Sequence, residues 1–261
     1  MRPRPFVHDT GLGPALVLLH AFPLDASQWD HQVAAWSGRY RCLRPDMYGC
    51  GRSPLPEGVT VSLEGYAAAL LDTLDALGVN DFGCVGASMG GYVALALLAL
   101  APARVRALVL VGSAATADTP GRRRERQGIA DRVMAEGLEF LASGAPDTAL
   151  GPRARAEAHI VDPLRGRVRG WTPGAVAAVE QALLHRPART DLLAALRVPT
   201  MVVGGGEDRL TPPPILDALA AQVPGAARHT FPGQGHLCNL EDPHQFSAAV
   251  GDFLDVAVPQ P

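Results

Sequence analysis

The sequence predicts an α/β fold, in which a mostly parallel central sheet is flanked by helices. Short apolar runs alternate with segments of helical periodicity along most of the chain, as in successive strand–helix units. Several of these runs lack alternation of polar and apolar residues, as expected for strands covered on both faces. The chain has 261 residues and is 48% hydrophobic, so it can bury a large core.

Six apolar runs are the predicted strands: Ala15–His20, Arg41–Arg44, Phe82–Ala87, Val105–Gly112, Pro199–Gly204 and Arg228–Phe231. Three helical patterns lie between or after them. Apolar side chains recur at helical spacing from Tyr66 to Leu77, and Gly78 ends that pattern. Gly90–Ala101 is nearly all apolar, which predicts a buried helix, and Pro243–Val256 is typical of a C-terminal helix packed on the sheet.

The strand–helix alternation stops between about Ala115 and Arg197. This stretch is rich in Ala, Gly, Pro and Arg and contains no convincing strand. We therefore predict a core domain made of residues 1–114 and 198–261. Residues 115–197 are predicted to form a mainly helical insertion that acts as a lid over one end of the sheet.

Composition excludes several classes of function. The net charge of −3 gives no pull toward nucleic acid or an anionic membrane. All 23 Lys and Arg residues are arginine, which excludes a lysine Schiff base. No CxxC or CxxH pair occurs, so we expect no zinc site. We also expect no other metal and no cofactor. The apolar stretch Tyr92–Ala101 is too short to span a bilayer, and we expect a cytoplasmic protein. The cysteines are Cys42, Cys50, Cys84 and Cys238.

The motif Gly86-Ala87-Ser88-Met89-Gly90-Gly91 lies between an apolar strand and an apolar helix. This is the context of the G-x-S-x-G nucleophile elbow, a sharp turn that strains the serine backbone and leaves no room for bulk two residues away. A glycine-rich chain can produce the pattern by chance. Its position between strand and helix favours Ser88 as a nucleophile.

A serine hydroxyl needs a base that is itself held by a carboxylate. Asp208 follows the strand Pro199–Gly204, and His236 lies in a glycine-rich loop after the last strand. Both are expected to converge on Ser88, because catalytic groups gather at the carboxyl ends of parallel strands. Glu207 and Asp118 are alternative acids. Apart from His20, the other histidines are expected to be surface or capping residues: His8, His31, His159, His185, His229 and His244.

Acyl transfer also needs backbone donors for a developing oxyanion. The N–H of Met89, directly after the nucleophile, is one candidate. The N–H of Phe22 is the other, since Pro23 has none. His20 and Trp171 are further candidates for contact with substrate.

The insertion holds many arginines, which could bind an acidic substrate group or form an ordinary solvated helix face in a lysine-free protein. They include Arg122–Arg124, Arg126, Arg153, Arg155, Arg165, Arg167 and Arg169. Leu138, Phe140 and Leu141 could line an apolar pocket or simply pack the insertion on the core.

These motifs, together with Arg44–Ser53, resemble the α/β-hydrolase superfamily over nearly the whole chain outside the insertion. The order Ser, Asp, His is that of the superfamily. The runs His20–Asp25 and Gly235–Pro243 are most similar to 3-oxoadipate enol-lactonase-like hydrolases. Two departures are Ala21, where the family often has glycine, and Cys50, where it often has histidine; Cys50 is expected to be a packing residue.

The resemblance implies a serine hydrolase that cleaves a small-molecule carboxylic ester or lactone through an acyl-enzyme. The same triad could instead serve carbon–carbon bond hydrolysis, thioester hydrolysis or perhydrolysis. A ligand receptor without turnover is a third alternative. The sequence leaves the oligomeric state open, a homo-oligomer included.

Overall fold

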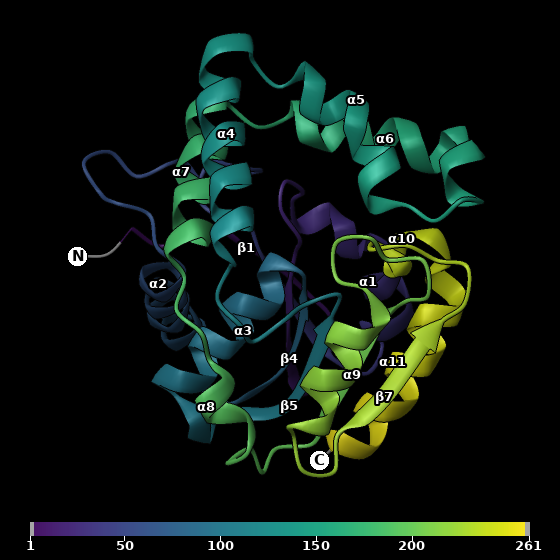
Figure 1. Ribbon diagram of the computed structural model, residues 1–261. Coiled ribbons are helices and arrows are strands. Elements are labelled where there is room, and N and C mark those ends of the chain that lie inside the picture. Colours follow the sequence, from purple (N-terminus) through teal and green to yellow (C-terminus); the bar gives the residue numbers. More distant parts are fainter. Residues whose placement is uncertain (1–2, 259–261) are drawn as a thin grey trace.

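The computed structural model describes residues 3–258 and contains a seven-stranded sheet in the order β1-β3-β2-β4-β5-β6-β7 (Figure 1). Strand β1 runs antiparallel to β3, and the other neighbouring strands are parallel. The strands are β1 (Val7–Thr10), β2 (Ala15–Leu19), β3 (Arg41–Pro45), β4 (Phe82–Ala87), β5 (Val105–Val111), β6 (Thr200–Gly205) and β7 (Ala227–Phe231).

The predicted α/β fold is confirmed, and each predicted strand is present with its ends displaced by at most one residue. Strand β1 was not predicted from the sequence. This strand has only four residues, Val7-His8-Asp9-Thr10, and pairs on one side only, with β3. An exposed edge strand needs no continuous apolar run, so its sequence carries little signal.

Helices cover both faces of the sheet and create two apolar cores. Successive residues of β2 point to opposite faces, so Val17 packs in one core and Leu18 in the other. The helices that follow or flank the strands are α1 (Asp30–Trp36), α2 (Leu63–Ala76), α3 (Met89–Leu100), α9 (Pro213–Ala221), α10 (Cys238–Glu241) and α11 (Pro243–Ala257), with 3₁₀ turns at Ala26–Trp29 and Pro102–Arg104.

Between β5 and β6 the chain is helical, and its helices within residues 120–185 lie above the sheet in Figure 1. Helix α4 packs on α7, and α5 packs on α6. The elements are α4 (Pro120–Glu136), α5 (Glu139–Ala149), a 3₁₀ turn at Ala154–Ala156, α6 (Ala158–Arg169), α7 (Pro173–His185) and the short α8 (Thr190–Leu193). The action of residues 115–197 as a lid stays a prediction. Among the described helices, none combines the length and the apolar character that crossing a membrane requires.

Candidate active site

Ser88 occupies the turn between β4 and α3 with φ 50° and ψ −111°. It is the one non-glycine residue with positive φ in the described chain, which marks a strained backbone. The turn is tight on both sides. A Cβ on Gly86 would lie 2.4 Å from the carbonyl oxygen of Gly90, and a Cβ on Gly90 would lie 2.2 Å from that of Leu19. Only glycine fits either position: Gly86 because of the turn itself, and Gly90 because of its close approach to β2.

His236 and Asp208 form a buried hydrogen-bonded pair. The Nδ1 atom of His236 lies 2.8 Å from Oδ2 of Asp208, and the two side chains are 5% and 0% exposed. Because a carboxylate accepts at Nδ1, that nitrogen carries the proton and Nε2 keeps a lone pair. The ring is therefore held in the tautomer that a general base needs.

Asp208 also anchors its own loop. Its second oxygen, Oδ1, accepts hydrogen bonds from the N–H groups of Leu210 and Thr211, at 2.8 Å and 2.9 Å. The following helix α9 begins at Pro213 without a side-chain cap, so these contacts hold the loop and do not cap a helix. One oxygen of the carboxylate thus holds the loop and the other holds His236.

The alternative acids lie elsewhere. Glu207 is exposed. Asp118 has a side chain that is only 6% exposed, but it is bound to two guanidinium groups, those of Arg126 and Arg186. Burial alone would raise the pKa of Asp118, but the two arginines outweigh it and hold that pKa below its ordinary value. Of the three predicted acids, only Asp208 is paired with His236.

Gly112, at the end of β5, lies beneath the His236–Asp208 pair. A Cβ on this residue, which has φ 53°, would lie 3.0 Å from Nδ1 of His236 and 3.3 Å from Oδ2 of Asp208. Strand β5 lies between β4 and β6, so the pair must cross its end to approach Ser88. The sequence analysis did not single out Gly112, although a glycine that ends an apolar strand was a visible signal.

The two residues predicted to supply the oxyanion donors line the same cavity as Ser88. Phe22, Ser88, Met89 and His236 all line a cavity of about 340 Å³. Within residues 3–258, neither the Phe22 N–H nor the Met89 N–H has a hydrogen-bond acceptor. Two unpaired backbone donors beside a serine are suited to stabilising an oxyanion.

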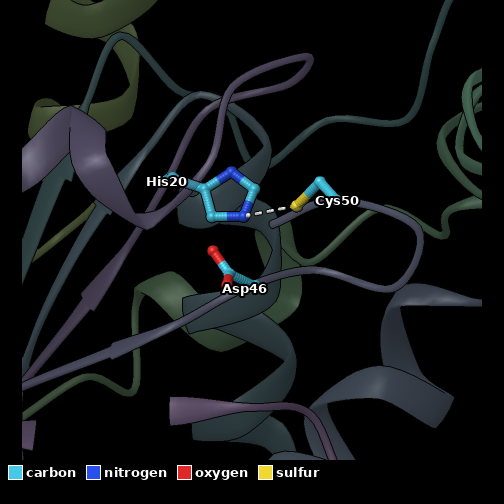
Figure 2. A group of neighbouring side chains, drawn as sticks. All are labelled: His20, Asp46 and Cys50. Atoms are coloured by element: carbon cyan, nitrogen blue, oxygen red, sulfur yellow. Dashed lines mark hydrogen bonds between the residues drawn. The ribbon is translucent and has the colours of Figure 1, made fainter. Parts of the chain in front are cut away.

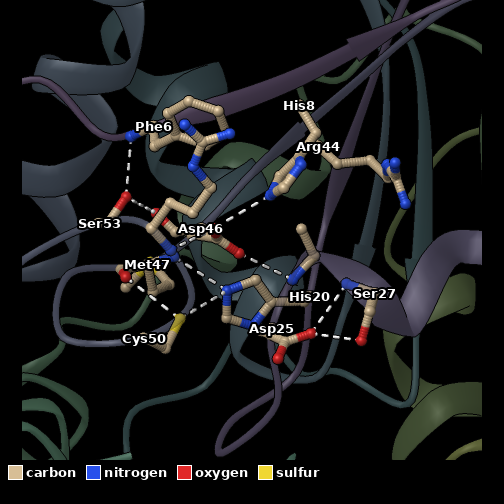
Figure 3. A network of polar contacts seen from close by, with 12 residues as sticks. Phe6, His8, His20, Asp25, Ser27, Arg44, Asp46, Met47, Cys50 and Ser53 are labelled. Atoms are coloured by element: carbon tan, nitrogen blue, oxygen red, sulfur yellow. Dashed lines mark hydrogen bonds and ion pairs between the residues drawn. The ribbon is translucent and has the colours of Figure 1, made fainter. Parts of the chain in front are cut away.

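His20 braces the loop that carries Phe22, and Figure 3 shows its contact with Met47 of the loop after β3. The Met47 N–H donates to Nε2 of His20 at 2.9 Å, so Nδ1 carries the ring proton and donates to the Ala21 carbonyl, also at 2.9 Å. Burial lowers the pKa of His20, which favours this neutral form. The ring thus connects the loop after β2 to the loop after β3.

Asp46 and Cys50 complete this brace (Figure 2). One potential metal-ligand atom from each of Asp46, Cys50 and His20 lies within 4.8 Å of the other two, a spacing that a metal site would also show. Each is already committed to the surrounding loops. Asp46 accepts from the N–H groups of Ala26 and Arg52, and the Cys50 thiol donates to the Met47 carbonyl. The contacts therefore indicate loop support.

Trp171 holds the same loop from the insertion. Its Nε1 donates to the Leu24 carbonyl at 3.1 Å, and its ring packs edge-on against Phe22 with the ring centroids 5.2 Å apart. Trp171 and His20 are 4% and 1% exposed, and neither lies in the described cavity lining. Both predicted substrate-contact residues are thus placed behind the Phe22 loop.

The cavity lining is apolar under α5 and α6 apart from Thr148, and under α4 and α7 it carries charged groups beside Ile129 and Leu183. The apolar side under α5 and α6 includes Phe140, Leu141, Leu164 and Val168. Helices α3, α4 and α7 supply the polar groups Tyr92, Arg122, Arg126 and Glu180. Sequence reasoning missed Tyr92 and Glu180, because nothing in their local patterns distinguishes them from ordinary helix residues.

Few of the insertion's arginines reach the cavity. Of those predicted as candidates for an acidic substrate, only Arg122 and Arg126 are part of the described lining. Arg169 instead pairs with Glu139 at the surface, and Arg167 donates to the Ser27 hydroxyl. Most of this arginine-rich stretch therefore serves the surface and the packing of helices.

The parallel sheet, the serine at the β4–α3 turn and the buried His–Asp pair at the same edge define an α/β-fold hydrolase. Residues 16–249 match the profile of the "Alpha/beta hydrolase family". The chain belongs to this family.

Similar proteins carry the names of different hydrolases. The chain is 29% identical to 2-hydroxymuconate semialdehyde hydrolase of Pseudomonas sp. (strain CF600), covering 95% of this chain and 89% of that protein. A thermophilic esterase from Thermogutta terrifontis, solved with malate bound, has a TM-score of 0.92 at 31% identity, covering 97% and 93%. The enol-lactonase of Burkholderia xenovorans LB400 has a TM-score of 0.87 at 26% identity, covering 95% of each chain. The predicted resemblance to esterases and enol-lactonases is confirmed.

Proposed function

We propose that this protein hydrolyses a small-molecule carboxylic ester or lactone, with Ser88 as nucleophile, His236 as general base and Asp208 as the residue that orients His236. The observation that carries the proposal is the 2.8 Å hydrogen bond between His236 and Asp208, because it fixes the tautomer of a histidine that shares a cavity with the strained Ser88. The likeness to an esterase and an enol-lactonase supports the substrate class.

The reaction proceeds in two halves. His236 takes the hydroxyl proton as Ser88 attacks the substrate carbonyl, and the N–H groups of Phe22 and Met89 bind the resulting oxyanion. The tetrahedral intermediate collapses to an acyl-enzyme as His236 gives its proton to the leaving alkoxide. A water molecule, deprotonated by His236, then attacks the acyl group, and His236 returns the proton to the Ser88 oxygen as the acid is released. Asp208 stabilises the imidazolium in both halves.

Replacing the nucleophile tests this proposal. Ser88→Ala is expected to abolish turnover of p-nitrophenyl esters and labelling by a fluorophosphonate, while circular dichroism shows an intact fold. Ser143→Ala is the matched control, since Ser143 is an exposed serine on α5. Turnover by Ser88→Ala at the wild-type rate would refute the role of Ser88.

A second measurement concerns the bond that is cleaved. One relative is named for a semialdehyde substrate, so esters of rising chain length, simple lactones and enol-lactones should be compared with a 2-hydroxymuconate semialdehyde. Our proposal predicts that an ester or lactone has the highest kcat/KM. Faster turnover of the semialdehyde would favour carbon–carbon bond hydrolysis by the same residues.

A further inference from the structure

A buried charge cluster forms one wall of the cavity. Arg126 of α4 donates through Nε to Asp118 at 2.5 Å and through Nη1 to Glu180 of α7 at 2.7 Å. Arg186 pairs with the other oxygen of Asp118 at 2.8 Å. All four side chains are 4–7% exposed. We refer to Asp118, Arg126, Glu180 and Arg186 as the α4–α7 cluster.

Only half of this cluster faces the cavity. Arg126 and Glu180 are part of the lining, whereas Asp118 and Arg186 lie behind them. Arg186 also stacks on the ring of Tyr92, with its guanidinium carbon 4.0 Å from the ring centre. Two carboxylates against two guanidiniums make the cluster neutral as a whole. Arg126 is therefore already compensated before any substrate binds.

A substrate carboxylate at this wall would have to compete with Glu180 for Arg126. It would add a third negative charge to two positive ones in a site shielded from water, and an uncompensated buried charge is costly. An uncharged carbonyl, amide or hydroxyl group creates no such imbalance. It can accept a hydrogen bond from the guanidinium N–H groups of Arg126 that Asp118 and Glu180 do not use.

Arg122 is the other arginine of the lining, and its situation differs. It pairs with Glu125 at 2.8 Å, and the two side chains are 37% and 63% exposed. Exposed ion pairs contribute little, because water screens both charges. Arg122 thus gives a carboxylate at the rim of the cavity only weak compensation compared with a buried guanidinium.

We propose that Glu180 determines specificity by occupying Arg126, so that the cavity takes esters or lactones whose arm under α4 and α7 is uncharged and rejects those with a free carboxylate there. The inference rests on the proposed ester or lactone hydrolysis and adds a substrate class to it. The other arm of the substrate lies against the apolar side under α5 and α6.

Matched ester pairs test this selectivity. The two members of the first pair differ at the end of the acyl arm, which is a carboxylate in one and the corresponding amide in the other. The two members of the second pair differ in the same way at the end of the alcohol arm. The wild-type protein is expected to have a kcat/KM at least about tenfold higher for the amide member of the pair whose variable arm lies under α4 and α7. For that pair, Glu180→Gln is expected to raise the ratio of kcat/KM for the acid to kcat/KM for the amide at least about tenfold. The reason is that this substitution leaves the cluster with one unbalanced positive charge.

Two variants serve as controls. Glu125→Gln makes the same chemical change beside the other cavity arginine and is expected to leave the selectivity unchanged. The double variant Arg126→Gln/Glu180→Gln restores a neutral cluster and is expected to return the preference to the amide. Equal shifts in Glu125→Gln and Glu180→Gln would overturn the assignment to Glu180.

A thermal-shift measurement gives a readout independent of turnover. Glutarate, a dicarboxylate, is expected to raise the Tm of Glu180→Gln and to leave that of the wild-type protein unchanged. If Glu180→Gln does not fold, the wild-type pairs remain decisive, since equal turnover of acid and amide in both pairs would overturn the inference. Failure of the wild-type protein to hydrolyse any ester or lactone would instead refute the proposed function.

Discussion

The side chain of Asp208 has two roles, one in holding its own loop and one in orienting His236. One oxygen holds the N–H groups of Leu210 and Thr211, and the other holds Nδ1 of His236. The first set of contacts fixes the loop after β6, and this loop in turn fixes the direction of the second oxygen. Orientation of the histidine thus follows from the local fold around the aspartate.

This dual role predicts the effect of Asp208→Asn. An amide can keep an oxygen toward Leu210 and Thr211, but its NH₂ group then faces His236 and favours the tautomer with the proton on Nε2. We expect kcat to fall about 10³- to 10⁴-fold with little loss of stability. Steady-state kinetics and thermal unfolding of the variant measure the two effects.

The adjacent residue supplies the control. Glu207→Gln removes a carboxylate from an exposed position one residue away and is expected to keep wild-type kcat. If Glu207→Gln lost activity as severely as Asp208→Asn, the assignment of the acid would be wrong.

The elbow is positioned by contacts between elements. Gly90 lies in the first turn of α3, where its Cα faces the backbone of β2 at Leu19, and Gly91 faces the side chain of Ser113 after β5. The sequence analysis assigned Gly90 to the steric needs of the turn. Its tightest contact is in fact with a neighbouring strand, so this glycine sets how closely helix and sheet approach.

We therefore expect Gly90→Ala to destabilise the protein by about 2 kcal/mol or more, because the added methyl group would meet a backbone carbonyl that cannot move without disturbing the sheet. Gly128→Ala is the matched control. Gly128 is an exposed residue within α4 whose Cβ would have open space around it, and alanine there should stabilise by about 0.5–1 kcal/mol. Chemical denaturation of both variants gives the two values, and opposite signs are expected.

The helical insertion also contacts the histidine loop. The N–H groups of His236 and Leu237 donate to the carbonyl of Ala149, at the end of α5. Glu241 accepts from the N–H groups of Gly151 and Gly235 at 2.9 Å and 2.8 Å. Burial raises the pKa of Glu241, although these two bonds favour its ionised form. The insertion and the proposed catalytic base are therefore coupled through backbone contacts.

Over the whole molecule, the cysteines belong to the two cores. All four are free and buried. Burial raises the pKa of Cys42 to about 11 and raises that of Cys50, Cys84 and Cys238 as well. The expectation that Cys50 is a packing residue agrees with its place in the brace behind the Phe22 loop.

Thiol reactivity should consequently report global unfolding. At pH 8 the native protein is expected to react slowly with 5,5′-dithiobis(2-nitrobenzoic acid), because the thiolate fraction and the access are both low. All four thiols should react rapidly in guanidinium chloride. Rapid modification of Cys50 in the native state, with loss of the proposed hydrolytic activity, would contradict this description of Cys50.

The sequence by itself determined the parallel sheet, the elbow at Ser88 and the chain order of the proposed triad. These features depend on local patterns: apolar runs without alternation, glycines two residues from a serine, and polar residues directly after strands. They could be predicted because each is dictated by the residues within a few positions. The short edge strand β1 was not predicted because its sequence contains no apolar run. It is a strand because it pairs with β3.

Only the tertiary structure decided how the rest of the site is built. It paired His236 with Asp208 and bound Asp118 to Arg126 and Arg186 instead. It placed Trp171 behind the Phe22 loop. Each of these outcomes depends on which buried charge or donor finds a partner from a distant segment. Burial makes an unpaired polar group costly, so partners are chosen across the whole fold, and no local pattern in the sequence records that choice.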